Sequence, residues 1–131
     1  MTAGLQVGVG RSIITPPVGT ILYGYAPGRP AESIHDDLRA TCLAVADASS
    51  RALLISADIC TYNEKNADRL RDLICSATGV LAQNILFCAT HTHSGPATSA
   101  GAGWGKTNDA YIRDLLEPAV IRAAQTAVDS L

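Results

Sequence analysis

The chain has 131 residues, the size of about one domain. Apolar residues make up 47% and charged residues 17%, a globular composition that excludes a disordered chain. The net charge of −2 offers no basic surface for nucleic acid, and no apolar run is long enough to form a transmembrane segment. The first residues lack the charged and then apolar pattern of a secretion signal. We therefore expect a cytoplasmic protein, or a secreted one if the true N-terminus is missing.

Three segments in the first half of the chain predict β-strands. Leu5–Val9 is a short strand that must end before the following prolines, because proline donates no ladder hydrogen bond. Residues 23–30 hold two glycines and two prolines and predict a loop. Two nearly continuous apolar stretches, 38–46 and 52–59, are separated by the turn-forming residues 47–50. They predict an antiparallel hairpin that is buried on both faces.

A helix, a strand and a second helix are predicted in the rest of the chain. Thr61 and Glu64 fit a capping box that would start the first helix, and Gly79 would end it. Apolar residues recur on one face of this helix, namely Ala67, Leu70, Leu73, Ile74 and Ala77. A strand over 84–89 follows, and then a glycine-rich polar loop over 90–108, which at this length is typical of a functional loop.

The second helix is predicted over 109–131. Its inward-facing residues are Ile112, Leu116, Ala119, Val120, Ala123 and Ala127. Pro118 lies inside it and should either kink the helix or mark a second start. The order of these elements predicts an α/β fold, a mixed sheet with helices packed on it.

The four cysteines give no sign of a metal ribbon or a redox motif. Cys42, Cys60, Cys75 and Cys88 are widely spaced and include no CxxC pair. Each lies in or beside an apolar segment, so we interpret them as small buried thiols in a reducing compartment.

Two of the three histidines, His91 and His93, lie two residues apart after the strand over 84–89. If strand geometry continues, both side chains point to the same side. They could then share a metal, or one could bind a metal while the other contacts substrate. Ligands usually bind at such strand ends in α/β sheets. On spacing alone, two polar histidines in a surface loop explain the pair equally well.

Other polar residues have weaker claims to a site. Asp58 ends a predicted strand and could orient a histidine through a hydrogen bond, or simply belong to a turn. His35 could line a cleft beside the loop that carries Tyr25, or lie on the surface, and Tyr25 could serve packing alone. Ser94 lacks the strand-to-helix elbow of a nucleophilic serine, so we expect it to structure its loop.

Residues 100–107 match a loose Walker A pattern of nucleotide-binding loops. A phosphate-binding loop of this kind requires an apolar strand directly before it, and the preceding residues are polar. A nucleotide site here is therefore the least favoured alternative.

The string from Thr90 to Pro96, Thr-His-Thr-His-Ser-Gly-Pro, resembles the signature of the neutral/alkaline (non-lysosomal) ceramidase family. Four other segments resemble family motifs in the same order: 7–19, 24–26, 34–38 and 56–59. The resemblance covers almost all of this chain but only the first part of a family member. It implies that residues 1–131 form a single domain or the N-terminal part of a larger α/β catalytic domain.

The resemblance implies a zinc-dependent amide hydrolase that cleaves ceramide into a fatty acid and sphingosine. It assigns His91 as a zinc ligand, and His93 to the substrate and its developing oxyanion. The family's other ligands, a second histidine, a glutamate and a tyrosine, belong to later parts of the family sequence. We therefore expect the chain alone to be inactive, since a catalytic zinc needs three protein ligands. The alternative is a non-catalytic module that binds a partner chain, such as its own missing C-terminal part or a second copy.

Overall fold

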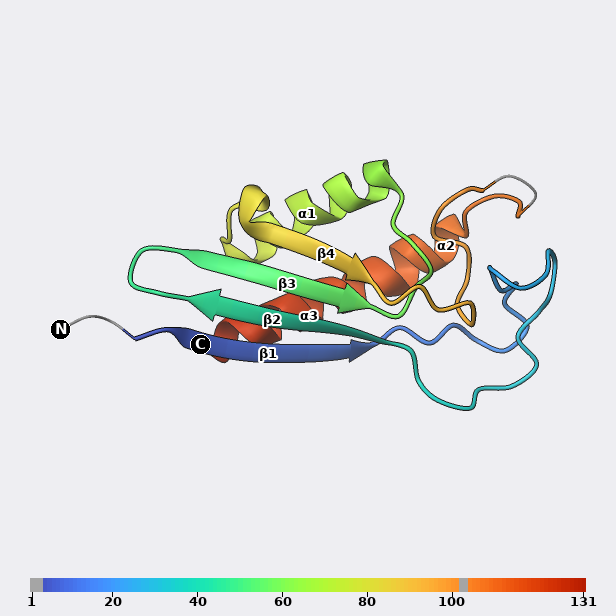
Figure 1. The fold of residues 1–131 in the computed structure, drawn as a ribbon, viewed down its shortest axis with the longest axis horizontal. Helices are drawn as coiled ribbons and strands as arrows, with labels where there is room; N and C mark the ends of the chain where they lie inside the picture. The colour runs from blue at the N-terminus through green and yellow to red at the C-terminus, as the bar shows by residue number, and fades with distance from the viewer. Residues whose placement is uncertain (1–3, 102–103) are drawn as a thin grey trace.

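The computed structural model describes residues 4–101 and 104–131 and contains one mixed four-stranded sheet (Figure 1). The strands lie in chain order across the sheet: β1 (Gln6–Ile13), β2 (Arg39–Ala46), β3 (Arg51–Ala57) and β4 (Ile85–Ala89). The first three pair antiparallel, and β4 runs parallel to β3. The predicted hairpin and the predicted fourth strand are thus confirmed.

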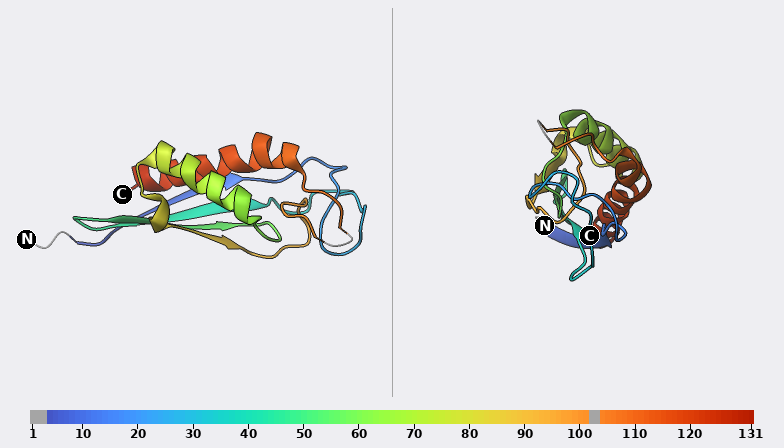
Figure 2. Two further views of the ribbon diagram at one scale, coloured as in Figure 1. Left: turned by 90° about the horizontal axis from the view of Figure 1, so that it is seen from above. Right: turned by 90° about the vertical axis from the view of Figure 1, so that its right-hand side faces the viewer.

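The helices cover one face of the sheet (Figure 2, left). Helix α1 (Glu64–Thr78) connects β3 to the 3-10 turn η1 (Ala82–Asn84) and β4. After the long loop, α2 (Asp109–Tyr111) and the π-helical turn η2 (Ile112–Leu116) lead into α3 (Glu117–Asp129). This arrangement confirms the α/β fold. None of the helices in the described part of the chain has the length and apolarity needed to cross a membrane.

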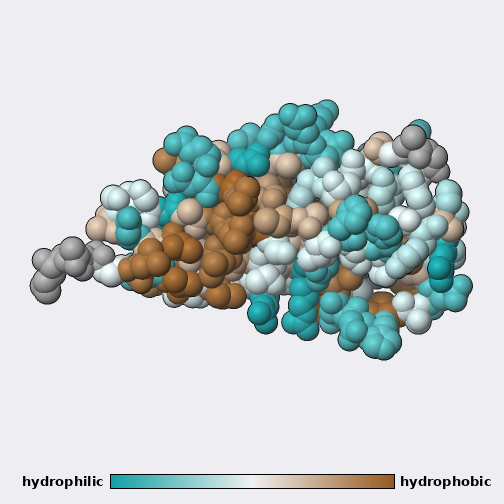
Figure 3. All heavy atoms as spheres, viewed as in Figure 1, coloured by the Kyte–Doolittle hydropathy of each residue, from teal (hydrophilic) through white to brown (hydrophobic). Residues whose placement is uncertain are grey.

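The hairpin is buried on one face only, which corrects the prediction of burial on both. Residues alternate along β2, so that Cys42 and Ala44 are buried while Leu43 is half-buried. On the open face, one residue from each strand forms an apolar row across the sheet: Val9, Leu43, Leu54 and Leu86. An apolar patch is visible on this face in Figure 3. The prediction failed because both faces carry apolar residues, whereas the helices cover only one.

Strand β1 is longer than predicted and lies directly against α3. Its pairing with β2 extends from Gln6 to Ile13, beyond the expected end at Val9. Gly8 and Gly10 face the helix, and the residues opposite them on α3 include the fully buried Ala123 and Ala127. The absence of side chains at the two glycines lets the helix backbone approach the strand closely.

The start of α1 differs from the predicted capping box. The N-cap is Asn63, whose side-chain oxygen accepts hydrogen bonds from the amides of Lys65 and Asn66. Asparagine is at least as good an N-cap residue as threonine, and Asn63 directly precedes Glu64, the first residue of the helix. Gly79 ends the helix in the left-handed conformation, as predicted. Leu70 and Ile74 are buried as expected, but Ala77 is exposed.

The second helical region keeps a helical backbone through Pro118, so the proline does not begin a separate helix. The junction residues Tyr111, Ile112, Leu116 and Glu117 all have right-handed helical dihedrals. Proline cannot donate the usual hydrogen bond, and the wider π turn η2 lies directly before it. The helix therefore continues past the proline, with one π-helical turn before it in place of a regular α-helical turn.

Replacing Tyr111 by phenylalanine is expected to lower the free energy of unfolding by about 1–2 kcal/mol. The Tyr111 hydroxyl donates a buried 2.7 Å hydrogen bond to the carbonyl of Ile14, which joins the second helical region to the end of β1. Its loss leaves that buried carbonyl without this donor. Urea unfolding measures the change. The exposed Tyr25→Phe is the control and should shift stability by less than about 0.5 kcal/mol.

Candidate metal centre

The candidate site lies where the parallel strands β3 and β4 end, at the end of the sheet where the long loops gather (Figure 1). Cys60 follows β3 and His91 follows β4. The amide of Thr90 donates to the carbonyl of Ala57, and the amide of His91 donates to that of Ile59. These hydrogen bonds continue the pairing of the two segments beyond the strands. They place His91 beside Cys60.

The two histidines converge, but not by the route that the sequence predicts. Strand β4 ends at Ala89, and His91 has a φ of 64°, the only positive φ of a non-glycine residue in the described ranges. Strand alternation therefore stops before the pair. The left-handed turn at His91 nevertheless leaves its ring 5.0 Å from that of His93, edge to face. A non-glycine residue in this conformation is strained by roughly 1–3 kcal/mol, and such residues are concentrated at functional sites.

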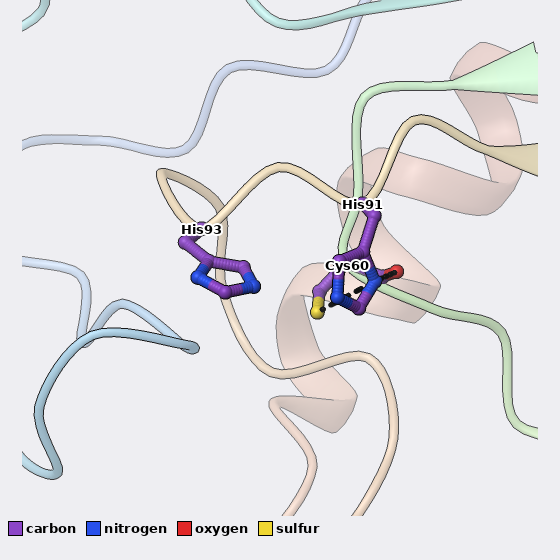
Figure 4. A group of neighbouring side chains, drawn as sticks. All are labelled: Cys60, His91 and His93. Carbon is purple, nitrogen blue, oxygen red and sulfur yellow. Dashed lines mark hydrogen bonds between the residues drawn. The ribbon is translucent and has the colours of Figure 1, made fainter.

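The His91 ring is held by the backbone of Cys60 (Figure 4). Its Nδ1 lies 2.8 Å from the Cys60 carbonyl oxygen, which can only accept, so Nδ1 carries the proton and donates. This leaves the lone pair of Nε2 free. Metal-binding histidines are commonly oriented by a hydrogen bond of this kind from their other ring nitrogen.

Cys60 joins the two histidines in one cluster. One potential ligand atom from each of the three residues lies within 4.8 Å of those of the others. Two imidazoles and a thiol are donor types that zinc prefers, so these residues fit the metal that the resemblance implies. From the sequence, Cys60 was expected only to lie in the core. The missed signal is that Cys60 follows the end of β3, and β3 pairs in parallel with β4, the strand that precedes the histidines.

The other cysteines do not lie in this cluster. All four thiols are free. Cys42 is buried and Cys75 is partly buried. Cys88, in contrast, is exposed, which corrects the expectation that all four are buried. It belongs to the open face of the sheet, where Ser56 is its partner in β3.

The loop of residues 21–30 packs against the histidine loop. The amide of Tyr23 donates to the carbonyl of Gly95, and Leu22 forms a bridge with Pro96. The edge of the Tyr25 ring lies against His93, with 5.2 Å between the ring centroids. The structure thus brings Tyr25 to the site, although its side chain is largely exposed.

Gly24→Ala is expected to displace the His93 ring. A Cβ at Gly24 would collide with Cγ of His93, and the φ of +121° disfavours any side chain. Ring NMR resonances of His93 would report the displacement. Gly28→Ala is the matched control, because Gly28 also has a positive φ but a Cβ added there would meet no atom within 4 Å. A His93 signal that is unchanged in Gly24→Ala, or changed equally in Gly28→Ala, would contradict the expected contact.

Asp58 does not orient a histidine in this structure. Its carboxylate accepts a 2.9 Å hydrogen bond from the amide of Arg39, and its own amide donates to the Arg39 carbonyl. It therefore fastens the start of β2 to the end of β3. The orienting role that the sequence suggested for Asp58 falls to the Cys60 carbonyl at His91.

His35 lies away from the histidine pair in the wall of a surface hollow. Its side chain is 95% exposed and lies 2.7 Å from the carboxylate of Asp36. The hollow has a volume of about 370 Å³ and is also lined by Leu22, Arg29 and Ser94. The same three residues line a second hollow of about 100 Å³, together with Tyr25, Ala26 and His93. The two hollows therefore adjoin, and only the smaller one reaches His93.

The geometry does not favour a nucleotide site at residues 100–107, of which 102–103 lie outside the described residues. A Walker A loop runs directly from a strand into a helix. Here β4 ends at Ala89, and the next helix begins only at Asp109. Trp104, within the segment, packs against Tyr23 with 5.3 Å between the rings.

Comparison with known proteins identifies relatives of one kind. No family model matches the chain. It is 33% identical over 132 residues to neutral ceramidase A of Dictyostelium discoideum, a match that covers 90% of this chain and 18% of that protein. The chain thus spans about a fifth of the length of this relative.

Two solved structures share the fold. A ceramidase complexed with C2 superposes with a TM-score of 0.72 at 20% identity, over 98% of this chain and 21% of that one. The neutral ceramidase from Pseudomonas aeruginosa gives a TM-score of 0.74 at 19% identity, over 99% of this chain and 22% of that one. These similarities favour neither a nucleotide binder nor a non-catalytic module. The sequence match and the shared fold together support the interpretation of this chain as a fragment of the neutral ceramidase family.

Proposed function

We propose that this chain contributes to a zinc-dependent hydrolase that cleaves the amide bond of an N-acylated sphingoid lipid such as ceramide. The observation that carries the proposal is the convergence of His91 and His93 at the ends of β3 and β4, in a chain that resembles neutral ceramidases. The relatives with the same fold are named as ceramidases.

His91 is the proposed zinc ligand and binds through Nε2. Its Nδ1–H donates to the Cys60 carbonyl, which holds the ring in one tautomer and one orientation. Zinc held at His91 would supply a lowered pKa for its bound water and polarisation of the amide carbonyl. The protein thus supplies a pre-oriented imidazole, and little reorganisation is needed when the ion binds.

His93 is the proposed contact to the reacting amide. Its side chain is half-buried in the wall of the smaller hollow, and the edge of the Tyr25 ring lies against it. From there a ring N–H can donate a hydrogen bond to the amide oxygen as negative charge develops on it. Donors that are positioned in advance stabilise this charge effectively because they need not reorient during the reaction.

The two adjoining hollows suggest where the lipid enters. The smaller hollow, about 100 Å³, is below the roughly 300–1,000 Å³ of a complete ligand pocket. It would hold the region of the scissile amide. The larger one, about 370 Å³, continues past Leu22 and Ser94 and could take a neighbouring part of the substrate. We infer that the described residues build one part of the lipid site.

The test uses the full-length gene product that carries these residues. A fluorogenic ceramide should be hydrolysed, chelation should stop the reaction, and zinc should restore it. The matched control substrate is a simple fatty amide without the sphingoid base, which should react more slowly. Ceramide hydrolysis that persists after complete removal of metal, or failure to hydrolyse either amide in the presence of zinc, would refute the proposal.

A further inference from the structure

We propose that Cys60 is a metal ligand, with its sulfur binding the same divalent ion as His91. This inference rests on the proposed metal at His91 and adds a donor to it. The ligand set implied by the family resemblance contains no sulfur. If Cys60 binds, the chain itself supplies two ligands, with His93 next to them.

The distances allow ligation with small side-chain movements. The ligand atoms of Cys60, His91 and His93 lie within 4.8 Å of one another. Two ligands of a tetrahedral zinc ion, at bond lengths of about 2.0–2.3 Å, lie roughly 3.5 Å apart. The Cys60 sulfur also lies 3.5 Å from Nδ1 of His91, so it is beside the ring whose other nitrogen, Nε2, would bind the ion. Closing the cluster on an ion therefore requires shifts on the order of 1 Å, without rearrangement of the strands.

The position of Cys60 distinguishes it from an ordinary core thiol. Its sulfur lies on the side of the His91 ring that faces His93 (Figure 4). Its carbonyl orients the same ring, so one residue supplies both the orienting acceptor and a potential ligand. Cys60 is only 4% exposed, while His91 is exposed. The thiol thus closes the inner side of the cluster, and the imidazoles leave the outer side open to water and substrate.

The donor set also predicts which ions bind. A thiolate and imidazoles favour zinc and cobalt over magnesium and calcium, which prefer oxygen ligands. The site should therefore bind zinc tightly and magnesium negligibly. Ligation by Cys60 and His91 would leave His93 free for the substrate contact that the proposed function gives it.

The test is a titration of the 131-residue chain with Co²⁺ under reducing conditions, followed by absorption spectroscopy. We expect a sulfur-to-cobalt charge-transfer band in the near ultraviolet. Cys60→Ser should abolish the band and weaken zinc binding by at least about 10-fold. Even the loss of a residue that only hydrogen-bonds to a metal ligand lowers metal affinity by about 10–100-fold. Cys88→Ser, at an exposed thiol on the sheet, is the matched control and should retain the band. Circular dichroism checks that each variant folds.

A second measurement avoids substitution at the buried position. With ¹¹³Cd²⁺ bound to the unaltered chain, the NMR chemical shift distinguishes a sulfur-containing set from an all-nitrogen one. A sulfur-type shift supports the inference even if Cys60→Ser fails to fold, provided that Cys88→Ser gives the same shift.

The outcomes separate this inference from the proposed function. Cobalt that binds without a charge-transfer band, and is lost in His91→Ala, would overturn ligation by Cys60 and leave the metal at His91 intact. A band that persists in Cys60→Ser would also overturn it. Failure of the chain to bind any cobalt or zinc would overturn this inference, while the proposed function would still be decided by the zinc dependence of the full-length gene product.

Discussion

Replacing His91 by alanine should remove zinc from the full-length gene product and lower amide hydrolysis by more than about 100-fold. Loss of a residue that merely supports a zinc ligand already costs about 10–100-fold, so loss of the ligand itself should cost more. The alanine also removes the imidazole that the Cys60 carbonyl holds in place. Zinc content by elemental analysis and the rate of ceramide hydrolysis measure the two effects.

His93→Ala is the companion variant and separates the two proposed roles. It should retain zinc in the full-length protein while its hydrolysis rate falls by roughly 100–1,000-fold, the usual effect of losing one oxyanion donor. Undiminished zinc content in His91→Ala would refute the assignment of His91. An unchanged rate in His93→Ala would refute the substrate contact of His93.

Gly10→Ala should destabilise the fold by about 3 kcal/mol, at the upper end of the usual cost of overpacking. The added Cβ would collide with the carbonyl oxygen of Ala123 and lie 2.8 Å from the amide nitrogen of Ala127. These atoms belong to the backbone of α3, in residues one helical turn apart, so they cannot move aside as a flexible side chain would. The helix must shift away from β1, and the core between them loosens. Thermal unfolding should show a midpoint lower by roughly 10 °C.

Gly4→Ala is the control for this prediction. A Cβ at Gly4 has no atom within 4 Å, so its substitution should leave the unfolding midpoint nearly unchanged. Equal midpoints for Gly10→Ala and the unaltered chain would show that α3 does not pack against β1 as closely as described.

The local elements could be predicted because each has a signal within its own segment. The turn at Asp47 joins two apolar stretches, and its carboxylate accepts from the amides of Ser49 and Ser50, so the hairpin forms as expected. Gly79 ends α1 for a similarly local reason, its positive φ. The N-cap was predicted wrongly because Thr61 and Asn63 are both capable caps, and in the structure the Thr61 hydroxyl donates to the Tyr62 carbonyl while Asn63 caps the helix.

At the candidate site, too, the sequence predicts residues that are neighbours along the chain but not contacts between distant residues. The Thr-His-Thr-His string identifies His91 and His93 from the sequence, because that motif occupies consecutive positions. Cys60 lies 31 residues from His91 in sequence, and only the parallel pairing of β3 with β4 brings the two together. Asp58, which directly follows β3, bonds instead to Arg39 of β2.

The sequence by itself determined the order of strands and helices, the resemblance to neutral ceramidases, and the pair of imidazoles, since these depend on residue types at short range. The tertiary structure alone decided which face of the sheet is covered, how closely α3 approaches β1, and that a thiol lies beside the histidines. Those features depend on contacts between segments distant along the chain. The hydrophobic periodicity of one segment does not specify which other segments pack against it.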